Sequence, residues 1–500
     1  GEISKHRYYR NRQIMGIKRY TANADTTITN AYKANLQTRG TGSNMGLADS
    51  LEVFHIYGQE SSSSSENARV LINFPVTEII SERAAGEIPA SGSVSWFLRV
   101  HNVVHPGTLP RNYNMTISAV SRSWDEGTGL DMEGYSDVGY ANWSGSASSS
   151  SGITAWTALG GDYHASPTYT SYFDNGTEDI EVDISTLVEQ WVAGTKGKYG
   201  VGIRMENESA FSSSYTKKFS ARGSQYFYSR PTLEARWDSA TKDDRGNFYY
   251  SSSLAPAADN LNTLYLYNYS RGRLVDIPGI GSGDNINVSF YASTSDAPSG
   301  AKILLPVGGG VAANLNVNAT GSWVSTGIYS ANLAITASAT PLTTIHDVWH
   351  SGSVEYHTGS ITPNSLNSSV ENSVSQMVMN ITNLRDSYYR NETARFRLFT
   401  RQKNWNPTIY TTAISTPENY IVESGSFKVV RLIDDLDVVA FGTGSDLHTQ
   451  MSFDSTGNYF DLDMSMLEAG YGYGIKFAFY DGGAGAWNEY PDVFKFRVEE

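Results

Sequence analysis

The sequence predicts an all-β protein of tandem β-sandwich or jelly-roll domains, with one short helix in the first domain. Three observations support this fold class. Apolar residues alternate with period two in short runs along the whole chain. Residues that disfavour helices are abundant, among them 46 glycines, and only 18% of residues are charged. The 500 residues exceed what one hydrophobic core usually holds, so several domains are expected.

The first expected element is a basic N-terminal arm over residues 1–22. Residues 1–20 carry six Lys and Arg against one Glu, although the whole chain has a net charge of −14. Such an arm either docks on an acidic neighbour or is a solvated terminus. In the docking interpretation, the contacts come from its basic side chains, which are Lys5, Arg7, Arg10, Arg12, Lys18 and Arg19.

Residues 23–237 are expected to form the first sandwich. Alternation over 94–100, in "VSWFLRV", predicts one of its strands. The stretch 183–194, "DISTLVEQWVAG", predicts the helix, because its apolar residues share one helical face. On this pattern Trp191 belongs to the core, and Gly194 ends the helix.

The stretch "RPTLEARW" (230–237) is expected to close this sandwich as its terminal strand. Its apolar residues at alternate positions would face the core, since successive side chains of a strand point to opposite faces. The polar residues between them would face solvent or a neighbouring protein; these are Thr232, Glu234 and Arg236.

Two further sandwiches are expected, over 238–350 and 351–500. The polar stretches "WDSATKDDRGN" and "HSGSVEYHTGSITP" suggest the two boundaries. Alternation in "NINVSFYAS" and in "ARFRLF" predicts strands within these domains.

One loop of the first domain, "SWDEGTGLDMEGYSDVGYANW" (123–143), has the composition of a ligand site. Aromatic faces beside hydrogen-bonding side chains suit a sugar, and its carboxylates suit Ca²⁺. Alternatively, its tryptophans are buried ends of the sandwich and its acids face water. The residues concerned are Trp124, Asp125, Glu126, Asp131, Tyr135, Tyr140 and Trp143.

No catalytic motif is recognised, so the chain is not expected to be an enzyme. His346 and His350 in "HDVWH" lack the Glu of the H-E-x-x-H zinc motif, and no resident metal or other cofactor is expected apart from the Ca²⁺ considered above. The chain has no cysteine and therefore no disulfide. Its acidic balance argues against nucleic acid or an anionic membrane as partner, and it has no apolar run of membrane-spanning length.

Five stretches of the first 237 residues occur in an order that resembles the DNRLRE-type β-sandwich, a jelly roll related to carbohydrate-binding modules. They are "SRSWDEGTG", "AWTALGGDY", "VDISTLVEQWVAG", "YGVGIR" and "KKFSARGS…SRPTLEARW". The name-giving string is missing from this chain. The resemblance implies a jelly roll and raises the alternative of a secreted or surface carbohydrate-binding protein.

A closer resemblance, over nearly the whole chain, is to virion structural proteins of marine tailed bacteriophages. It is carried by "IKRYTANADTTITNAY", "LNTLYLYNYSRGRL", "RLIDDLDVVAFGTGS" and "GNYFDLDMSMLEAGYGYGIKFAFY", among others. It implies a non-enzymatic structural protein in the virion, assembled in the host cytoplasm, as a head decoration, a neck or tail component or an appendage. The implied partners are other virion proteins and further copies of the chain, with a host surface glycan as an additional ligand.

Overall fold

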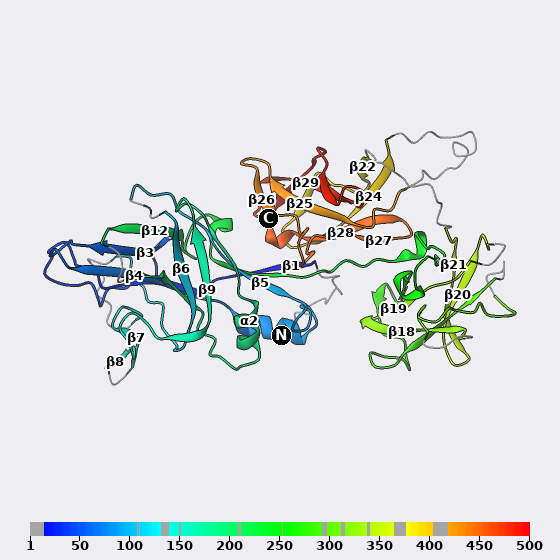
Figure 1. Cartoon of the computed structure of the whole chain (residues 1–500), viewed down its shortest axis with the longest axis horizontal. Helices are drawn as coiled ribbons and strands as arrows, with labels where there is room; N and C mark the ends of the chain where they lie inside the picture. Colours follow the sequence, from blue (N-terminus) through cyan, green and yellow to red (C-terminus); the bar gives the residue numbers. More distant parts are fainter. Residues whose placement is uncertain are drawn as a thin grey trace, which may run out of the picture. The chain divides into compact units, whose positions relative to one another are not determined.

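A computed structural model describes residues 15–107, 109, 111–131, 140–149, 152–208, 212–252, 254–292, 298–311, 316–337, 341–364, 377–403 and 419–500. These residues form many short strands and two α-helices, arranged in several sheets (Figure 1). The all-β fold class predicted from the sequence is therefore confirmed. The chain divides into two compact units, one of Gly16–Trp237 with Asp446–His448, and one of the remainder.

The first domain pairs a four-stranded sheet with a seven-stranded one. The smaller sheet has the order β1-β13-β5-β10, and the larger has β12-β3-β4-β11-β6-β9 with β2 beside β4. Every strand pair in both sheets is antiparallel. The bounds are β1 Ile17–Thr21, β2 Ala24–Thr29, β3 Ser50–Tyr57, β4 Ser65–Asn73, β5 Ser95–Val100, β6 Tyr113–Val120, β9 Tyr163–Phe173, β10 Ile180–Asp183, β11 Val201–Met205, β12 Tyr215–Ser220 and β13 Thr232–Arg236, with a hairpin of β7 Gly145–Ser149 and β8 Gly152–Ala155.

The apolar residues at alternate strand positions form the core of this domain, as predicted. In β5 the residues Trp96, Leu98 and Val100 are fully buried, and in β13 so are Leu233 and Ala235. The register sets Leu233 opposite Leu98, so the two strands supply one continuous apolar face. The expected terminal strand therefore belongs to the interior of the smaller sheet, between β1 and β5.

Among its described residues this domain has two α-helices, one more than predicted. The expected helix is α2, Ser185–Val192, in which Trp191 is fully buried. It ends at Gly194, whose φ of +74° suits a residue without a Cβ. The additional helix is α1, Val76–Ala84. Its buried residues, Val76 and Ile79, make too short an apolar pattern to distinguish a helix from a strand.

In the described part of residues 238–364, the second domain, the strands form a six-stranded sheet and a two-stranded pair, with a buried apolar cluster. The order of the six-stranded sheet is β14-β19-β18-β17-β20-β21. The hairpin of β20 and β21 pairs residues 345–361 and turns at Gly352, with φ +57°. The expected boundary at residue 350 lies inside this hairpin, because the polar stretch read as a linker is its turn. The bounds are β14 Asn262–Tyr267, β17 Ile286–Tyr291, β18 Asn318–Ser325, β19 Ile328–Leu333, β20 Ile345–Ser351 and β21 Val354–Ile361, with the pair β15 Tyr269–Ser270 and β16 Arg273–Leu274.

The third domain has two sheets, of order β22-β24-β28-β27 and β23-β31-β29-β25-β26, with β30 beside β29. Aromatic rings fill its core, and those of Phe427 and Phe460 stack 4.0 Å apart. The bounds are β22 Met377–Ile381, β23 Ser387–Tyr389, β24 Thr393–Gln402, β25 Gly425–Arg431, β26 Leu436–Val439, β27 Ser452–Asp454, β28 Gly457–Asp463, β29 Gly472–Asp481, β30 Ala486–Glu489 and β31 Phe494–Glu499.

Candidate functional site

The tryptophans of the loop singled out in the sequence serve the packing of the first domain. Trp143 is 5% exposed and lies in an apolar cluster with Trp156, against which Trp124 also packs. The indole N–H of Trp124 donates to the Tyr199 carbonyl at 2.9 Å. The Arg69 guanidinium covers the Trp143 ring, 4.9 Å from its centroid. Neither ring is therefore a free face on which a sugar could stack.

The turn beneath Trp143 explains the motif "WTALGGD" (156–162). Gly160 has φ +87°, and a Cβ there would lie 2.9 Å from the Trp143 ring. Asp162 accepts hydrogen bonds from the backbone N–H groups of Thr157 and Ala158, each at 3.0 Å. The glycine permits the close approach of the ring, and the aspartate closes the turn.

The acids of the loop separate into different environments. Glu126 accepts from two of the three guanidinium nitrogens of Arg222, Nε and Nη2, and from the Asp25 N–H at 2.7 Å. Asp125 and Asp131 are exposed, and Tyr140 is half-buried. Tyr135 lies outside the described residues. The loop thus contributes one carboxylate to an internal cluster instead of gathering its acids at one point.

Asp25 completes that cluster from strand β2. It is 1% exposed, and its Oδ2 accepts from the Arg222 backbone N–H at 2.6 Å. Burial, and then the negative charge of Glu126, raise the pKa of Asp25 to about 7, although the Arg222 N–H bond and charge oppose the shift. Both carboxyl groups therefore bind Arg222, Glu126 at the guanidinium and Asp25 at the backbone N–H. Of the two, Asp25 is the one that stays protonated over much of the acid pH range.

Replacing Asp25 by asparagine is expected to remove a pH dependence of stability. The pKa of Asp25 is about 7 in the folded state and 3.8 in the free group, so the folded state binds a proton at Asp25 more tightly than the unfolded state does. Its contribution is present below pH 3.8 and is lost as pH rises to 7, with a slope of up to about 1.4 kcal/mol per unit. Hydrogen exchange of strand β2, compared between variant and parent at each pH, should show Asp25→Asn more stable at pH 8 and the difference shrinking toward pH 4. A difference that does not change with pH would contradict this.

Only part of the predicted docking arm is described, because the described residues begin at Met15. Lys5, Arg7, Arg10 and Arg12 lie outside them. Lys18 and Arg19 lie in β1, which pairs with β13 over its whole length, so the boundary expected at residue 22 differs from the structure. Lys18 contacts Glu82 and Glu87, and Arg19 binds Glu234 at 2.6 Å. The apolar residues of "IKRYT", Ile17 and Tyr20, lie three positions apart and do not alternate, so the sequence pattern carries no clear signal for this strand.

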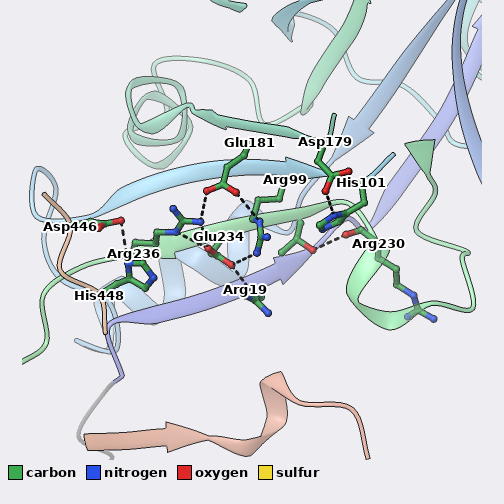
Figure 2. Close-up of polar contacts among 11 residues, drawn as sticks. Arg19, Arg99, His101, Asp179, Glu181, Arg230, Glu234, Arg236, Asp446 and His448 are labelled. Atoms are coloured by element: carbon green, nitrogen blue, oxygen red, sulfur yellow. Dashed lines mark hydrogen bonds and ion pairs between the residues drawn. The ribbon is translucent and has the colours of Figure 1, made fainter. Parts of the chain in front are cut away.

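Glu234 is the centre of a charge cluster on the face of the smaller sheet opposite to the core (Figure 2). Its carboxylate accepts from Arg19 Nε at 2.6 Å, from Arg99 Nη1 at 3.0 Å and from Arg236 Nε at 2.7 Å. Arg236 also binds Glu181 at 2.7 Å. The expectation that Glu234 faces solvent or a neighbour is wrong, because its side chain is 1% exposed.

The register explains the cluster. Arg19 of β1 lies directly opposite Glu234 of β13, and Phe97 of β5 lies on its other side. The Arg236 guanidinium stacks over the Phe97 ring, 4.1 Å from its centroid. Burial alone would raise the pKa of Glu234, but the three arginines together hold it well below its ordinary value. The carboxylate is therefore ionised throughout the physiological range and supports the fold.

Two further features bear on the classes of function considered above. Within the described ranges, no three His, Asp or Glu side chains are grouped so that they could hold a metal ion. Neither helix of the described chain is long and apolar enough to cross a membrane.

Comparisons with known proteins do not assign this chain to a family. No family model matches the chain, and no curated protein matches it. A solved structure described as "Titin Ig tandem domains A164-A165" is similar over 42% of this chain and 80% of that one, at 7% identity and a TM-score of 0.14. A TM-score this low carries no argument about the fold or the function of this chain.

Proposed function

We propose that this chain is a non-enzymatic structural protein of a tailed-phage virion. The observation that supports this best is that both tryptophans and Glu126 of the suspected ligand site are engaged within their own domain. Trp143 is packed under Arg69, and Glu126 is bound to Arg222. What distinguishes the chain is then its series of all-β domains, which suits a building block of a larger assembly.

In this proposal the domains pack against neighbouring virion proteins and further copies of the chain. Single apolar side chains project from several loops and would enter such contacts; examples are Val104, Leu254 and Ile433, which are 90%, 95% and 76% exposed. The basic residues preceding β1 would add an electrostatic contact to an acidic neighbour. Head decoration, neck or tail component and appendage are all consistent with this arrangement.

Quantitative mass spectrometry of purified particles tests the proposal. We expect a fixed ratio of this chain to the major capsid protein, and its value would indicate the symmetry of the occupied position. Absence from particles, with the chain found free or on cell surfaces, would contradict the proposal and favour the carbohydrate-binding alternative.

A variant of the basic arm tests the docking contact separately. Replacing Lys5, Arg7, Arg10 and Arg12 by glutamine should reduce incorporation into particles. The matched control replaces two exposed arginines of the second domain, Arg271 and Arg273, and should incorporate normally. Equal incorporation of both variants would exclude the arm as the docking element.

A further inference from the structure

The loop between β9 and β10, residues 174–179, contains the only Asn-Gly pair of the sequence, Asn175-Gly176. Asparagine is a chemically labile residue. It is most labile before glycine, because a following residue without a Cβ lets its backbone nitrogen reach the asparagine side chain. Asn175 is exposed, so the sequence and the exposure together predict a reactive site. The surroundings of the pair in the fold oppose that reaction.

Glu178 binds the two N–H groups of this pair. Its Oε1 accepts from the Asn175 N–H at 2.7 Å, and its Oε2 accepts from the Gly176 N–H at 2.8 Å. Burial would raise the pKa of Glu178, but these bonds and the charge of Lys217 hold it below its ordinary value. The side chain is therefore an ionised carboxylate at neutral pH, and both hydrogen bonds are charge-assisted.

Lys217 binds the carbonyl side of the same loop. It lies in β12 and is 0% exposed. Its Nζ donates to the carbonyls of Gly176 and Glu178 at 2.9 and 2.8 Å, and to Asn102 Oδ1 at 2.6 Å. Three N–H donors thus meet three oxygens, which satisfies a buried ammonium. Loss of any one of these oxygens would leave a charged donor unpaired in the interior of the domain.

The Gly176 peptide is therefore fixed on both sides. Deamidation requires the Gly176 nitrogen to give up its proton, and the charge of the Glu178 carboxylate, 2.8 Å away, opposes a negative nitrogen. A rotation of this peptide toward Asn175 Cγ would also pull the Gly176 carbonyl away from Lys217. Both effects raise the barrier to reaction in the folded domain.

We propose that Asn175 is the principal deamidation site of this chain, and that Glu178 and Lys217 keep it unreacted in the folded domain. In the reaction the Gly176 nitrogen attacks Asn175 Cγ, a new N–C bond forms, and the bond from Cγ to Nδ2 breaks. The proton of the Gly176 nitrogen passes to Nδ2, which leaves as ammonia. Water then opens the five-membered imide ring and gives aspartate or isoaspartate. Neither step consumes an oxidant, a reductant or a cofactor.

The product would weaken the loop. It adds a negative charge to a segment that already carries Asp174, Glu178 and Asp179. Isoaspartate also inserts a methylene into the backbone before Gly176, which displaces the Gly176 carbonyl from Lys217. In a virion the proteins are not replaced after assembly, so even a slow reaction would accumulate. This consequence rests on the proposed function, whereas the chemistry of the pair does not.

Peptide mass spectrometry of the full chain, incubated at neutral pH either folded or unfolded in urea, tests the proposal. Deamidation raises the mass of a peptide by about 1 Da. In the unfolded chain we expect the peptide containing Asn175 to change first. In the folded chain it should change at least about tenfold more slowly, because the reaction then needs local opening of the loop. Equal rates in the two states, or a faster change at another asparagine of the unfolded chain, would overturn the proposal.

Variants identify the protecting groups. Glu178→Ala removes the acceptor of both N–H groups and should speed the change at Asn175 in the folded chain by about tenfold or more. The matched control is Thr177→Ala, because Thr177 is exposed in the same loop, and this variant should react at the parent rate. Lys217→Met should act in the same direction as Glu178→Ala.

The comparison of the two loop variants is decisive, because Lys217→Met could unfold the domain. If Glu178→Ala reacts no faster than Thr177→Ala, Glu178 does not protect the pair and the proposal fails. These rates are measured on the purified chain and do not depend on its presence in particles. The inference and the proposed function can therefore fail separately.

Discussion

Replacing Glu234 by glutamine is expected to lower the free energy of unfolding of the first domain by about 3–5 kcal/mol. The side chain is 1% exposed and binds Arg19, Arg99 and Arg236. Glutamine keeps the shape but removes the charge, so three guanidinium groups lose their common anion. The penalty arises mainly because these cations are themselves largely withdrawn from water.

Hydrogen exchange of peptides from β5 and β13 in the full chain measures this loss. Glu181→Gln is the matched control, because Glu181 joins the same cluster but is 45% exposed, and it should cost less than about 1 kcal/mol. The pKa of Glu234 is held below 4.5, so its contribution is present above that pH and is lost as pH falls further. Equal effects of the two variants, or an undiminished loss at low pH, would contradict the assignment of Glu234 as the anchor.

Replacing Asp347 by alanine should destabilise the second domain by a similar amount, about 3–5 kcal/mol. The Asp347 side chain is fully buried, and Arg245 binds both of its oxygens, each at 2.7 Å. The Trp349 indole N–H donates to the same carboxylate at 2.8 Å. Gly359 lies opposite Asp347 in the register, and a Cβ there would lie 2.3 Å from Arg245 Nη1. The glycine therefore makes room for the ion pair.

The loss is measured by hydrogen exchange of β20 and β21, with Glu355→Gln as the matched control. Glu355 lies on the same hairpin but is exposed, so its replacement should change stability by less than about 0.5 kcal/mol. Protection of these strands that is unchanged in Asp347→Ala would show that Arg245 finds another partner.

Much of the fold followed from local patterns. The helix α2 and the apolar faces of β5 and β13 lie where alternation and helical spacing predicted them. One compact unit consists of Gly16–Trp237 together with Asp446–His448. The turn at Gly352 was mistaken for a linker, because glycine and serine mark hairpin turns and domain boundaries alike.

The candidate site is harder to predict from the sequence than the fold is, because the contacts of a charged side chain depend on residues far away in the chain. The sequence by itself determined the all-β class, the apolar faces of the strands and the acidic balance, because these depend on residue type and spacing. Only the tertiary structure decided that Glu234 is buried among arginines and that Lys217 meets Asn102. Each of those contacts joins residues brought together by strand register across long stretches of chain, and a register is set by the packing of whole sheets.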